Sequence, residues 1–328
     1  MMINSETVAT VHDAMEEEYD DINDIWYSHL YNEIHRFLVA NLCLGDGLRV
    51  LDVGCGTGFQ SILLSYSGYN VRGFDIAAKL VKLAQKKIEL LNNSHQKLSH
   101  LFKTSYESFS KEQATIIELA DELRNHASIK WPTLWVGDAT DPNSYDSGEY
   151  DVIVCCGSVL SFIEEHKRVI NLMSNALKKG GTLFIEVEQK CNLDLIWPLL
   201  DLATNGKLHY EQTLKEIIKN LFAKPKTNIY INYPFLLSHG DEVLLPMCLF
   251  SVKYLEDLFA QNGLEIINRK GIHILTNILP STLLHRQYPN KYIYWPFSFI
   301  SQIDKLLSCY WPFWRLGCSV IYCLKKGN

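Results

Sequence analysis

The stretch Arg49–Ser61, RVLDVGCGTGFQS, begins with an apolar run, breaks into a glycine-rich turn and then resumes as a helix-like segment. The run Arg49–Val53 suits a strand that is buried on both faces. The turn holds three glycines at alternate positions: Gly54, Gly56 and Gly58. Because glycine permits positive φ angles and a close approach of the backbone to a ligand, the stretch predicts a cradle of the nucleotide-binding type.

The details of the cradle argue against a dinucleotide. The spacing is G-x-G-x-G, and Phe59 stands where the dinucleotide fingerprint places its third glycine. A second apolar strand is expected at Asn70–Phe74, and Asp75 follows it, about 20 residues after the first glycine of the turn. An acidic residue at this spacing accepts hydrogen bonds from ribose hydroxyls, and it needs no phosphate on the ligand.

These residues resemble the first motif of the class I S-adenosylmethionine-dependent methyltransferases, in which hydrophobic residues precede D-x-G-x-G-x-G. The resemblance implies that the backbone from Gly54 to Gly58 packs against the methionine portion of the cofactor and that Asp52 helps to hold that end. It also implies an α/β fold: a Rossmann-like, doubly wound, seven-stranded sheet, mostly parallel with an antiparallel last strand, plus a cap of inserted helices. A glycine-rich turn of some other α/β fold is the alternative.

The resemblance extends to two later strands. With S-adenosylmethionine as the cofactor, Asp75 and Ile76 are expected at the ribose. A short strand is predicted at Thr133–Val136, and the residues that follow it, Asp138 and Ala139, match the family position that flanks the adenine.

The fourth predicted strand, Tyr150–Cys156, opens into the loop Gly157–Phe162. Ligands of open α/β sheets bind outside the carboxyl ends of the strands. We therefore expect Cys156 at the cofactor and this loop at the sulfonium and the incoming acceptor. A fifth buried strand is predicted at Thr182–Val187, after a turn with two glycines.

Methyl transfer is a direct displacement, so the chain needs no nucleophile of its own, but a base assists an amine or a hydroxyl acceptor. The candidates for this base are Tyr27, His29, His166 and Glu188. Structural roles are the alternative, and for His166 a solvated first turn of a helix is favoured. No N-P-P-Y or D-P-P-Y motif follows the fourth strand, which argues against DNA-adenine and protein-glutamine acceptors. Neither H-E-x-x-H nor the paired-cysteine spacing of a zinc site occurs, so no metal is expected.

At the N-terminus we expect an adaptable tail over Met1–Thr10 and helical structure over Val11–Cys43. Within it, Tyr19 in YDDIND matches a tyrosine that covers the cofactor in related enzymes, and simple packing of this side chain is the alternative. Together with the aromatic segment Tyr288–Trp314, the segment Tyr19–Tyr31 is expected to close the acceptor cavity.

Beyond the fifth strand, a helix is expected at Ser251–Gln261 and strands at Leu264–Ile274 and Cys318–Lys325. The predicted organisation is a helical cover (1–45), a cofactor-binding core (46–190), a cap insertion (191–250) and the end of the core sheet (251–328), with insertions at 92–130 and 276–317. The last insertion holds four prolines and many aromatic residues. It is interpreted as a structural excursion, as a lid or dimer contact, or as a membrane-surface contact, the last disfavoured by its few cations.

Composition sets the outer limits. The chain has 328 residues, 47% of them hydrophobic, a formal charge of −6 and a pI near 6.0. It is thus large enough to bury a core, and it lacks the basic character of nucleic-acid-binding proteins. Nine cysteines without C-x-x-C spacing indicate a reduced, cytoplasmic protein. No secretory signal and no apolar stretch of about 18 residues is found, so stable membrane insertion is not expected, whereas weak peripheral contact is left open.

The sequence therefore predicts a methyltransferase that acts at nitrogen or oxygen of a small-molecule acceptor, such as a specialised metabolite. Two alternatives stay open: an NAD-dependent oxidoreductase and a non-catalytic cofactor-binding module. A homodimer is compatible with the sequence.

Overall fold

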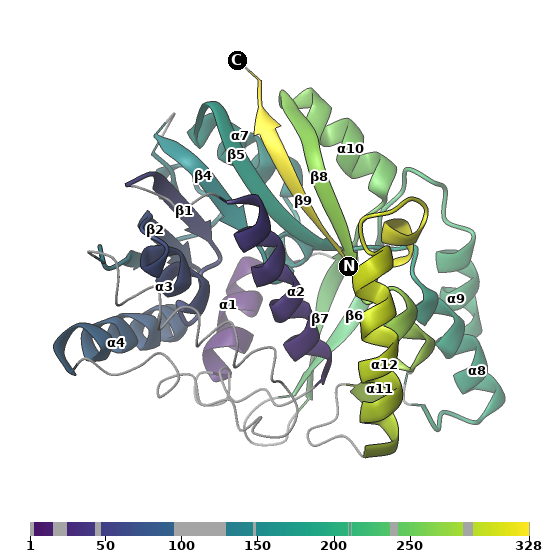
Figure 1. The fold of residues 1–328 in the computed structure, drawn as a ribbon. Helices are drawn as coiled ribbons and strands as arrows, with labels where there is room; N and C mark the ends of the chain where they lie inside the picture. The colour runs from purple at the N-terminus through teal and green to yellow at the C-terminus, as the bar shows by residue number, and fades with distance from the viewer. Residues whose placement is uncertain are drawn as a thin grey trace.

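In the computed structural model, the described part of the chain comprises residues 3–15, 25–42, 47–94, 129–146, 149–208, 210, 212–236, 242–284 and 291–327. Its centre is one twisted sheet with helices packed on both faces (Figure 1). The predicted insertion at 92–130 lies mostly outside the described residues, as do the acidic run 16–21 and, with it, Tyr19.

Seven strands form the central sheet, in the order β3-β2-β1-β4-β5-β9-β8. Their bounds are β1 (Arg49–Val53), β2 (Asn70–Asp75), β3 (Thr133–Val136), β4 (Tyr150–Cys155), β5 (Leu177–Glu188), β8 (Leu264–Ile272) and β9 (Ser319–Lys326). The first five pair in parallel, whereas β9 is antiparallel to both of its neighbours, β5 and β8. The predicted Rossmann-like, doubly wound sheet with an antiparallel last strand is confirmed.

The strands are buried on both faces because their apolar side chains alternate between two cores. Leu51 of β1 and Ile153 of β4 belong to one buried cluster, whereas the adjacent Val50 and Val152 belong to the other. Strands that are apolar on both faces require helices on both sides of the sheet.

Five helices cover these faces: α2 (Ile25–Asn41), α3 (Phe59–Tyr66), α4 (Ala78–Ser94), α7 (His166–Ala176) and α10 (Val252–Gln261). Met173 of α7 and Phe259 of α10 belong to the core that contains Leu51. Ile34 and Phe37 of α2 belong to the opposite core. The carboxyl ends of the parallel strands therefore form one edge of the sheet, which is the edge that binds ligands in such folds.

The expectation of an adaptable tail over Met1–Thr10 is wrong for most of its length. Helix α1 (Ser5–Ala14) begins within it, and the side chain of Asn4 caps the helix by accepting a hydrogen bond from the N–H of Glu6, at 2.9 Å. Val8 and Val11 are buried. The helix forms because these two side chains have other elements to pack against, which local sequence does not reveal.

The cap and the aromatic insertion are both built of short elements. The cap contains η3 (Leu193–Ile196), α8 (Trp197–Ala203), α9 (Leu214–Leu221) and an antiparallel ribbon of β6 (Ile229–Leu236) and β7 (Glu242–Leu249). The insertion contains η4 (Leu275–Ile278), α11 (Ser281–Leu284), α12 (Lys291–Leu307) and η5 (Phe313–Leu316). Two further short helices, η1 (Pro142–Ser144) and η2 (Val159–Phe162), flank β4.

The insertion is tied to the sheet by one buried carboxylate. Asp304 of α12 accepts hydrogen bonds from the backbone N–H groups of Ile274, Leu275 and Thr276, at 2.7–3.1 Å, directly after β8. Pro296 stands inside α12 without ending it. Within the described residues, no helix has the length and apolar character needed to cross a bilayer.

Candidate active site

The glycine turn after β1 packs too closely for side chains. Gly54, Gly56 and Gly58 all have positive φ, of 78°, 49° and 83°. A Cβ atom at Gly54 would lie 2.3 Å from a methyl carbon of Val159, and one at Gly58 would lie 2.9 Å from the Cβ of Ala84. The turn thus presents bare backbone at the carboxyl edge of the sheet, as a nucleoside cradle requires.

Asp75 ends β2 beside this turn. Its Oδ2 accepts a hydrogen bond from the N–H of Gly56 at 2.9 Å, and its Oδ1 accepts one from the N–H of Ala77 at 2.8 Å. Burial raises the pKa of Asp75, while the two N–H donors and nearby His12 oppose that change. Because each carboxylate oxygen has a second lone pair, both can still accept ribose hydroxyls. Ile76 follows, half-buried.

Asp52 is turned toward helix α3. Its Oδ2 accepts a hydrogen bond from the hydroxyl of Ser61 at 2.6 Å, and its Oδ1 accepts one from the amide of Gln60 at 2.8 Å. Burial raises the pKa of Asp52 to about 6. These contacts anchor the start of α3 behind the turn. The expected role of Asp52 at the methionine end of the cofactor stays a prediction.

The loop after β3 holds the residues expected at the adenine. The N–H of Gly137 donates to the carbonyl of Asp75 at 2.9 Å, which holds this loop beside Asp75. The Oδ1 of Asp138 accepts hydrogen bonds from the N–H and the hydroxyl of Thr140, at 2.7 and 2.8 Å. Ala139 is buried in the core. The contact of this loop with adenine stays a prediction.

Glu186 of β5 holds the loop after β4 by hydrogen bonds. The Oε2 of Glu186 accepts hydrogen bonds from the N–H groups of Gly157 and Ser158, at 3.0 and 2.6 Å, and its Oε1 accepts one from the hydroxyl of Ser319. Ser158 has a left-handed φ of 59°, which these contacts stabilise. Its hydroxyl donates to Oε1 of Glu188 at 2.9 Å.

Glu188 lies at the end of β5, where a base could reach an acceptor. Burial and, after it, the negative charge of Glu186 raise the pKa of Glu188 to about 8. The Ser158 hydroxyl acts the other way. A buried carboxyl with such a pKa, at the ligand edge of an α/β sheet, is typical of a functional site.

Tyrosines of α2 and β6 lie beside this loop. The hydroxyl of Tyr31 lies 3.3 Å from the position that a Cβ atom on Gly157 would occupy. Tyr27, one turn earlier, shares a hydrogen bond of 2.6 Å between its hydroxyl and that of Tyr233 in the β6–β7 ribbon. The cover and the cap therefore meet directly over the loop.

Helix α1 closes the other side. The ring of Phe162 lies between those of His12 and Tyr233, with centroid distances of 6.1 and 6.4 Å. Asp13 accepts the N–H of Lys79 at the start of α4, at 2.7 Å. Helix α1 thus crosses the carboxyl ends of the parallel strands, from the ribose site to the ribbon, as Figure 1 shows.

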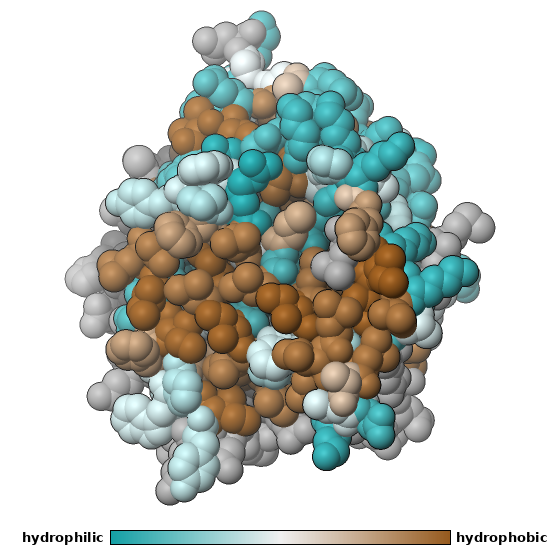
Figure 2. All heavy atoms as spheres, turned by 90° about the vertical axis from the view of Figure 1, so that its right-hand side faces the viewer, coloured by the Kyte–Doolittle hydropathy of each residue, from teal (hydrophilic) through white to brown (hydrophobic). Residues whose placement is uncertain are grey.

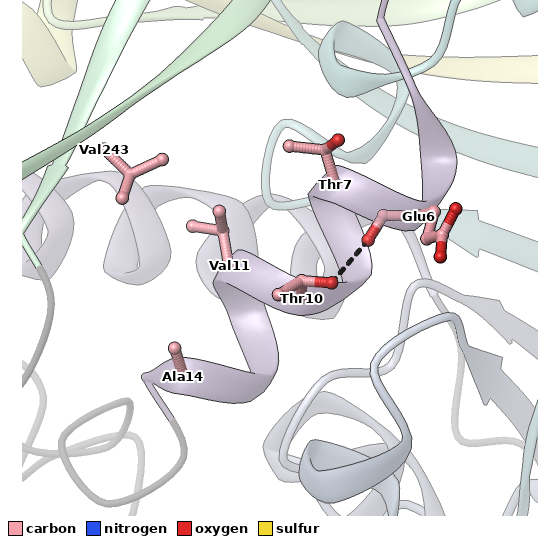
Figure 3. Close-up of a pocket in the computed structure, with 6 residues that line it drawn as sticks. All are labelled: Glu6, Thr7, Thr10, Val11, Ala14 and Val243. Carbon is pink, nitrogen blue, oxygen red and sulfur yellow. Dashed lines mark hydrogen bonds between the residues drawn. The ribbon is translucent and has the colours of Figure 1, made fainter.

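A shallow hollow lies between α1 and β7 (Figure 3). Small and apolar groups dominate its lining, and the only hydrogen bond drawn there joins the Thr10 hydroxyl to the carbonyl of Glu6 at 2.8 Å. Its lining residues are Glu6, Thr7, Thr10, Val11, Ala14 and Val243. None of the predicted site residues is among them.

The two predicted histidines lie in other surroundings. His29 is buried beside the rings of His273 and Phe297, at 4.8 and 5.4 Å, and burial lowers its pKa to about 3, so it is neutral. The Nε2 of His166 lies 2.7 Å from the hydroxyl of Tyr254 on α10. Of the four predicted bases, Glu188 contacts Ser158 in the loop after β4, and Tyr27 contacts Tyr233 of the ribbon. The contacts of the two histidines lie elsewhere, and those of His166 are with Tyr254 of α10 and with Phe250.

Cys156 ends the predicted fourth strand and is buried among residues of the α2-side core. Burial raises the pKa of its thiol well above the usual value, which makes the thiol unreactive, and its expected place at the cofactor stays a prediction. Within the described residues, no group of three or more histidine, cysteine or acidic side chains is arranged to hold a metal ion.

Sequence reasoning missed three residues of this site: Glu186, Ser158 as a partner of Glu188, and Tyr233. One signal was present for the first, because Glu186 and Glu188 alternate in an otherwise apolar strand and so share one face. The other two depend on contacts between segments far apart in sequence.

Residues 25–269 match the family described as "Methyltransferase domain". Since this match covers most of the chain, the protein belongs to that family, and it is of the class I, S-adenosylmethionine-dependent type. S-adenosylmethionine is its cofactor. The bare glycine backbone and the free lone pairs of Asp75 fit the nucleoside portion of this molecule.

Several curated proteins are similar to parts of the chain. Human glycine N-methyltransferase is 30% identical over 145 residues, covering 42% of this chain and 40% of the relative. Ubiquinone biosynthesis O-methyltransferase of Xanthomonas campestris pv. campestris (strain B100) is 29% identical over 157 residues, covering 48% and 50%. The matches thus span half or less of each relative. The [4+2]-cyclase SpnF shares the fold, with a TM-score of 0.55 and 14% identity over 100% of this chain and 97% of its own.

Proposed function

We propose that the protein transfers the methyl group of S-adenosylmethionine to a nitrogen or oxygen atom of a small molecule, such as a specialised metabolite. The observation that carries the proposal is the buried pair of Glu188 and Ser158 at the carboxyl ends of the central strands. Tyr31 of the cover lies at the same loop, and Tyr27 of the cover meets Tyr233 of the cap. We infer that these tyrosines enclose an acceptor of small size.

The relatives support the same class of acceptor. Their names describe N-methylation of glycine and O-methylation in ubiquinone biosynthesis, both of them reactions of small molecules. The similarity covers half or less of each relative, so the acceptor itself must be determined from this chain's own cap.

The cofactor supplies an electrophilic methyl group, and the protein has to position the acceptor and remove its proton. Glu188 is suited to the second task because its pKa of about 8 makes its carboxylate a stronger base than an exposed glutamate. The Ser158 hydroxyl donates to one oxygen of Glu188 and so orients the carboxyl group. In this proposal, Tyr31 and Tyr27 shield the bound acceptor from water.

The test is Glu188→Gln, which keeps the shape and the acceptor for Ser158. We expect kcat to fall by about 10²–10⁴-fold, while affinity for S-adenosylhomocysteine stays unchanged. In the wild type, the rate should rise with pH to a plateau above about 8, and this rise should be absent in the variant. Glu149→Gln, at an exposed carboxylate paired with Arg49, is the matched control. An unchanged kcat and pH profile in Glu188→Gln would refute the assignment of Glu188.

A non-catalytic cofactor-binding module is the second candidate, since the likeness to a [4+2]-cyclase shows that this fold alone does not fix methyl transfer. Turnover separates the two. The protein is incubated with S-adenosylmethionine and a panel of amines, phenols and carboxylic acids, and the formation of S-adenosylhomocysteine is measured. If the protein binds the cofactor but forms no S-adenosylhomocysteine with any of these acceptors or with a cell extract, the non-catalytic module is favoured. An NAD-dependent oxidoreductase is not retained, because the chain belongs to the methyltransferases.

A further inference from the structure

One face of the molecule, away from the candidate active site, exposes large apolar side chains from the cap and the aromatic insertion. Brown atoms gather over it in Figure 2, on the side where α8, α9, α11 and α12 lie in Figure 1. We call this the apolar face. Its members are Ile196, Leu199, Leu200, Leu202, Leu214, Ile218, Phe222, Ile278, Tyr292, Trp295, Phe299, Leu306, Tyr310 and Trp311.

The exposed side chains recur at helical spacing. On α12, Tyr292, Trp295 and Phe299 follow one another at intervals of three and four residues, with exposures of 75%, 70% and 70%. On α9 and its end, Leu214, Ile218 and Phe222 follow at intervals of four, and Phe222 is 82% exposed. Each helix therefore turns an apolar stripe outward, and contiguous apolar surface of this kind marks an interaction site.

The charges around the apolar face are unevenly distributed. Of the acidic side chains described in 193–226 and 291–317, Asp201 and Asp304 are buried and Asp194 is half-buried. All three accept hydrogen bonds from neighbouring groups: Asp194 from Ser281 and Tyr210, Asp201 from the backbone of residues 208 and 210, and Asp304 from the backbone after β8. Glu216, the fourth, caps the start of α9.

Among the basic side chains described in the same segments, Lys305 is half-buried and Lys226 pairs with Asp257. Those exposed to solvent include Lys207, Lys215, Lys219 and Arg315. On α9 the two lysines recur at an interval of four, one position after Leu214 and Ile218. A protein with a net charge of −6 thus carries an apolar face with a basic edge.

We propose that the apolar face docks onto the surface of a lipid bilayer that contains anionic headgroups. Tryptophan and tyrosine favour the membrane–water interface, and an amphipathic helix with lysines beside its apolar stripe lies in that plane. The basic edge is complementary to anionic lipid. A second copy of the chain fits this face less well than a bilayer does. In a symmetric dimer both copies contribute the same lysine-rich edge to the contact, and like charges repel each other.

The test is co-sedimentation with vesicles of phosphatidylcholine alone and of phosphatidylcholine with phosphatidylserine. We expect binding to the anionic vesicles, weakened by added salt. The double variant Lys215→Glu/Lys219→Glu should bind at least about ten-fold more weakly. Its matched control is Lys82→Glu/Lys86→Glu, which reverses two exposed lysines at the same spacing on α4.

The apolar contribution is tested by Trp295→Asp/Phe222→Asp, with Ile267→Asp, an exposed apolar residue of β8, as the control. The first variant should lose sedimentation and the control should retain it. Unchanged affinity for S-adenosylhomocysteine shows that each variant is folded. Failure of the wild type to bind anionic vesicles overturns the proposal. So does a dimer in solution that Trp295→Asp/Phe222→Asp dissociates, because the face then belongs to a second copy.

Discussion

Replacement of Asp75 by alanine tests the nucleoside site most directly. The carboxylate holds the N–H groups of Gly56 and Ala77, at 2.9 and 2.8 Å, and is expected to accept the ribose hydroxyls. Hydrogen bonds to a charged group contribute about 1.5–3 kcal/mol each. Loss of one such bond to the ribose predicts an affinity for S-adenosylhomocysteine that is lower by about ten- to 150-fold.

The affinity is measured by isothermal titration calorimetry with S-adenosylhomocysteine, and the free energy of unfolding by urea titration. The loss of the two backbone partners should destabilise the turn as well, so both quantities are needed. Asp146→Ala is the control, since that carboxylate is 46% exposed and pairs with Arg72 at the opposite end of the strands. If folded Asp75→Ala binds S-adenosylhomocysteine within about two-fold of the wild type, Asp75 is not the ribose acceptor.

Three further variants test the packing and the buried charges. Gly54→Val should destabilise the fold by about 1–3 kcal/mol in urea titration, because a left-handed φ and contact with Val159 oppose the new side chain; unaltered stability would contradict this reason. Lys270→Met leaves the carboxylate of Glu33, which is 3% exposed, without its cation and should cost about 3–5 kcal/mol, most of which Lys270→Met/Glu33→Gln should restore. The pKa of Glu188 in the folded protein is raised from 4.5 to about 8, so its protonated form stabilises the fold. This contribution is full below pH 4.5 and is lost as the pH rises toward about 8. In urea titrations, the free energy of unfolding should therefore decline less over this interval in Glu188→Gln than in the wild type.

The central sheet could be predicted because its signals are local. An apolar run that ends in alternating glycines predicts both a strand and the turn that follows it. Strand β3 has the predicted bounds, Thr133–Val136. The order of strand, helix and acidic residue then fixes the parallel arrangement. The ribose candidate Asp75 follows from spacing alone, and the structure places it beside the glycine turn.

The acceptor side could not be predicted in the same way, because it is formed by contacts between distant segments. Tyr27 meets Tyr233 only once the cover and the ribbon have folded toward each other. Helix α1 depends on partners elsewhere in the chain for burying Val8 and Val11, and its short sequence has no independent stability to announce it. The apolar face likewise combines residues of the cap and of the insertion. The sequence argument against a membrane contact counted only the few cations of the insertion and left out the lysines of the cap.

Helix α2 connects the candidate active site with the aromatic insertion. Tyr27 and Tyr31 share the side of the helix that faces the candidate active site, while Trp26 and His29 lie on the side that contacts the insertion. The ring of Trp26 stacks on that of His273 at 3.8 Å, and Phe297 of α12 packs against His29. The expectation that both ends of the chain cover the acceptor cavity stays a prediction. Residues of α2 contact the loop after β4 and the ribbon, and Phe297 of α12 packs against α2. An acceptor that orders α2 would affect the insertion through this shared helix, without any contact of its own with α12.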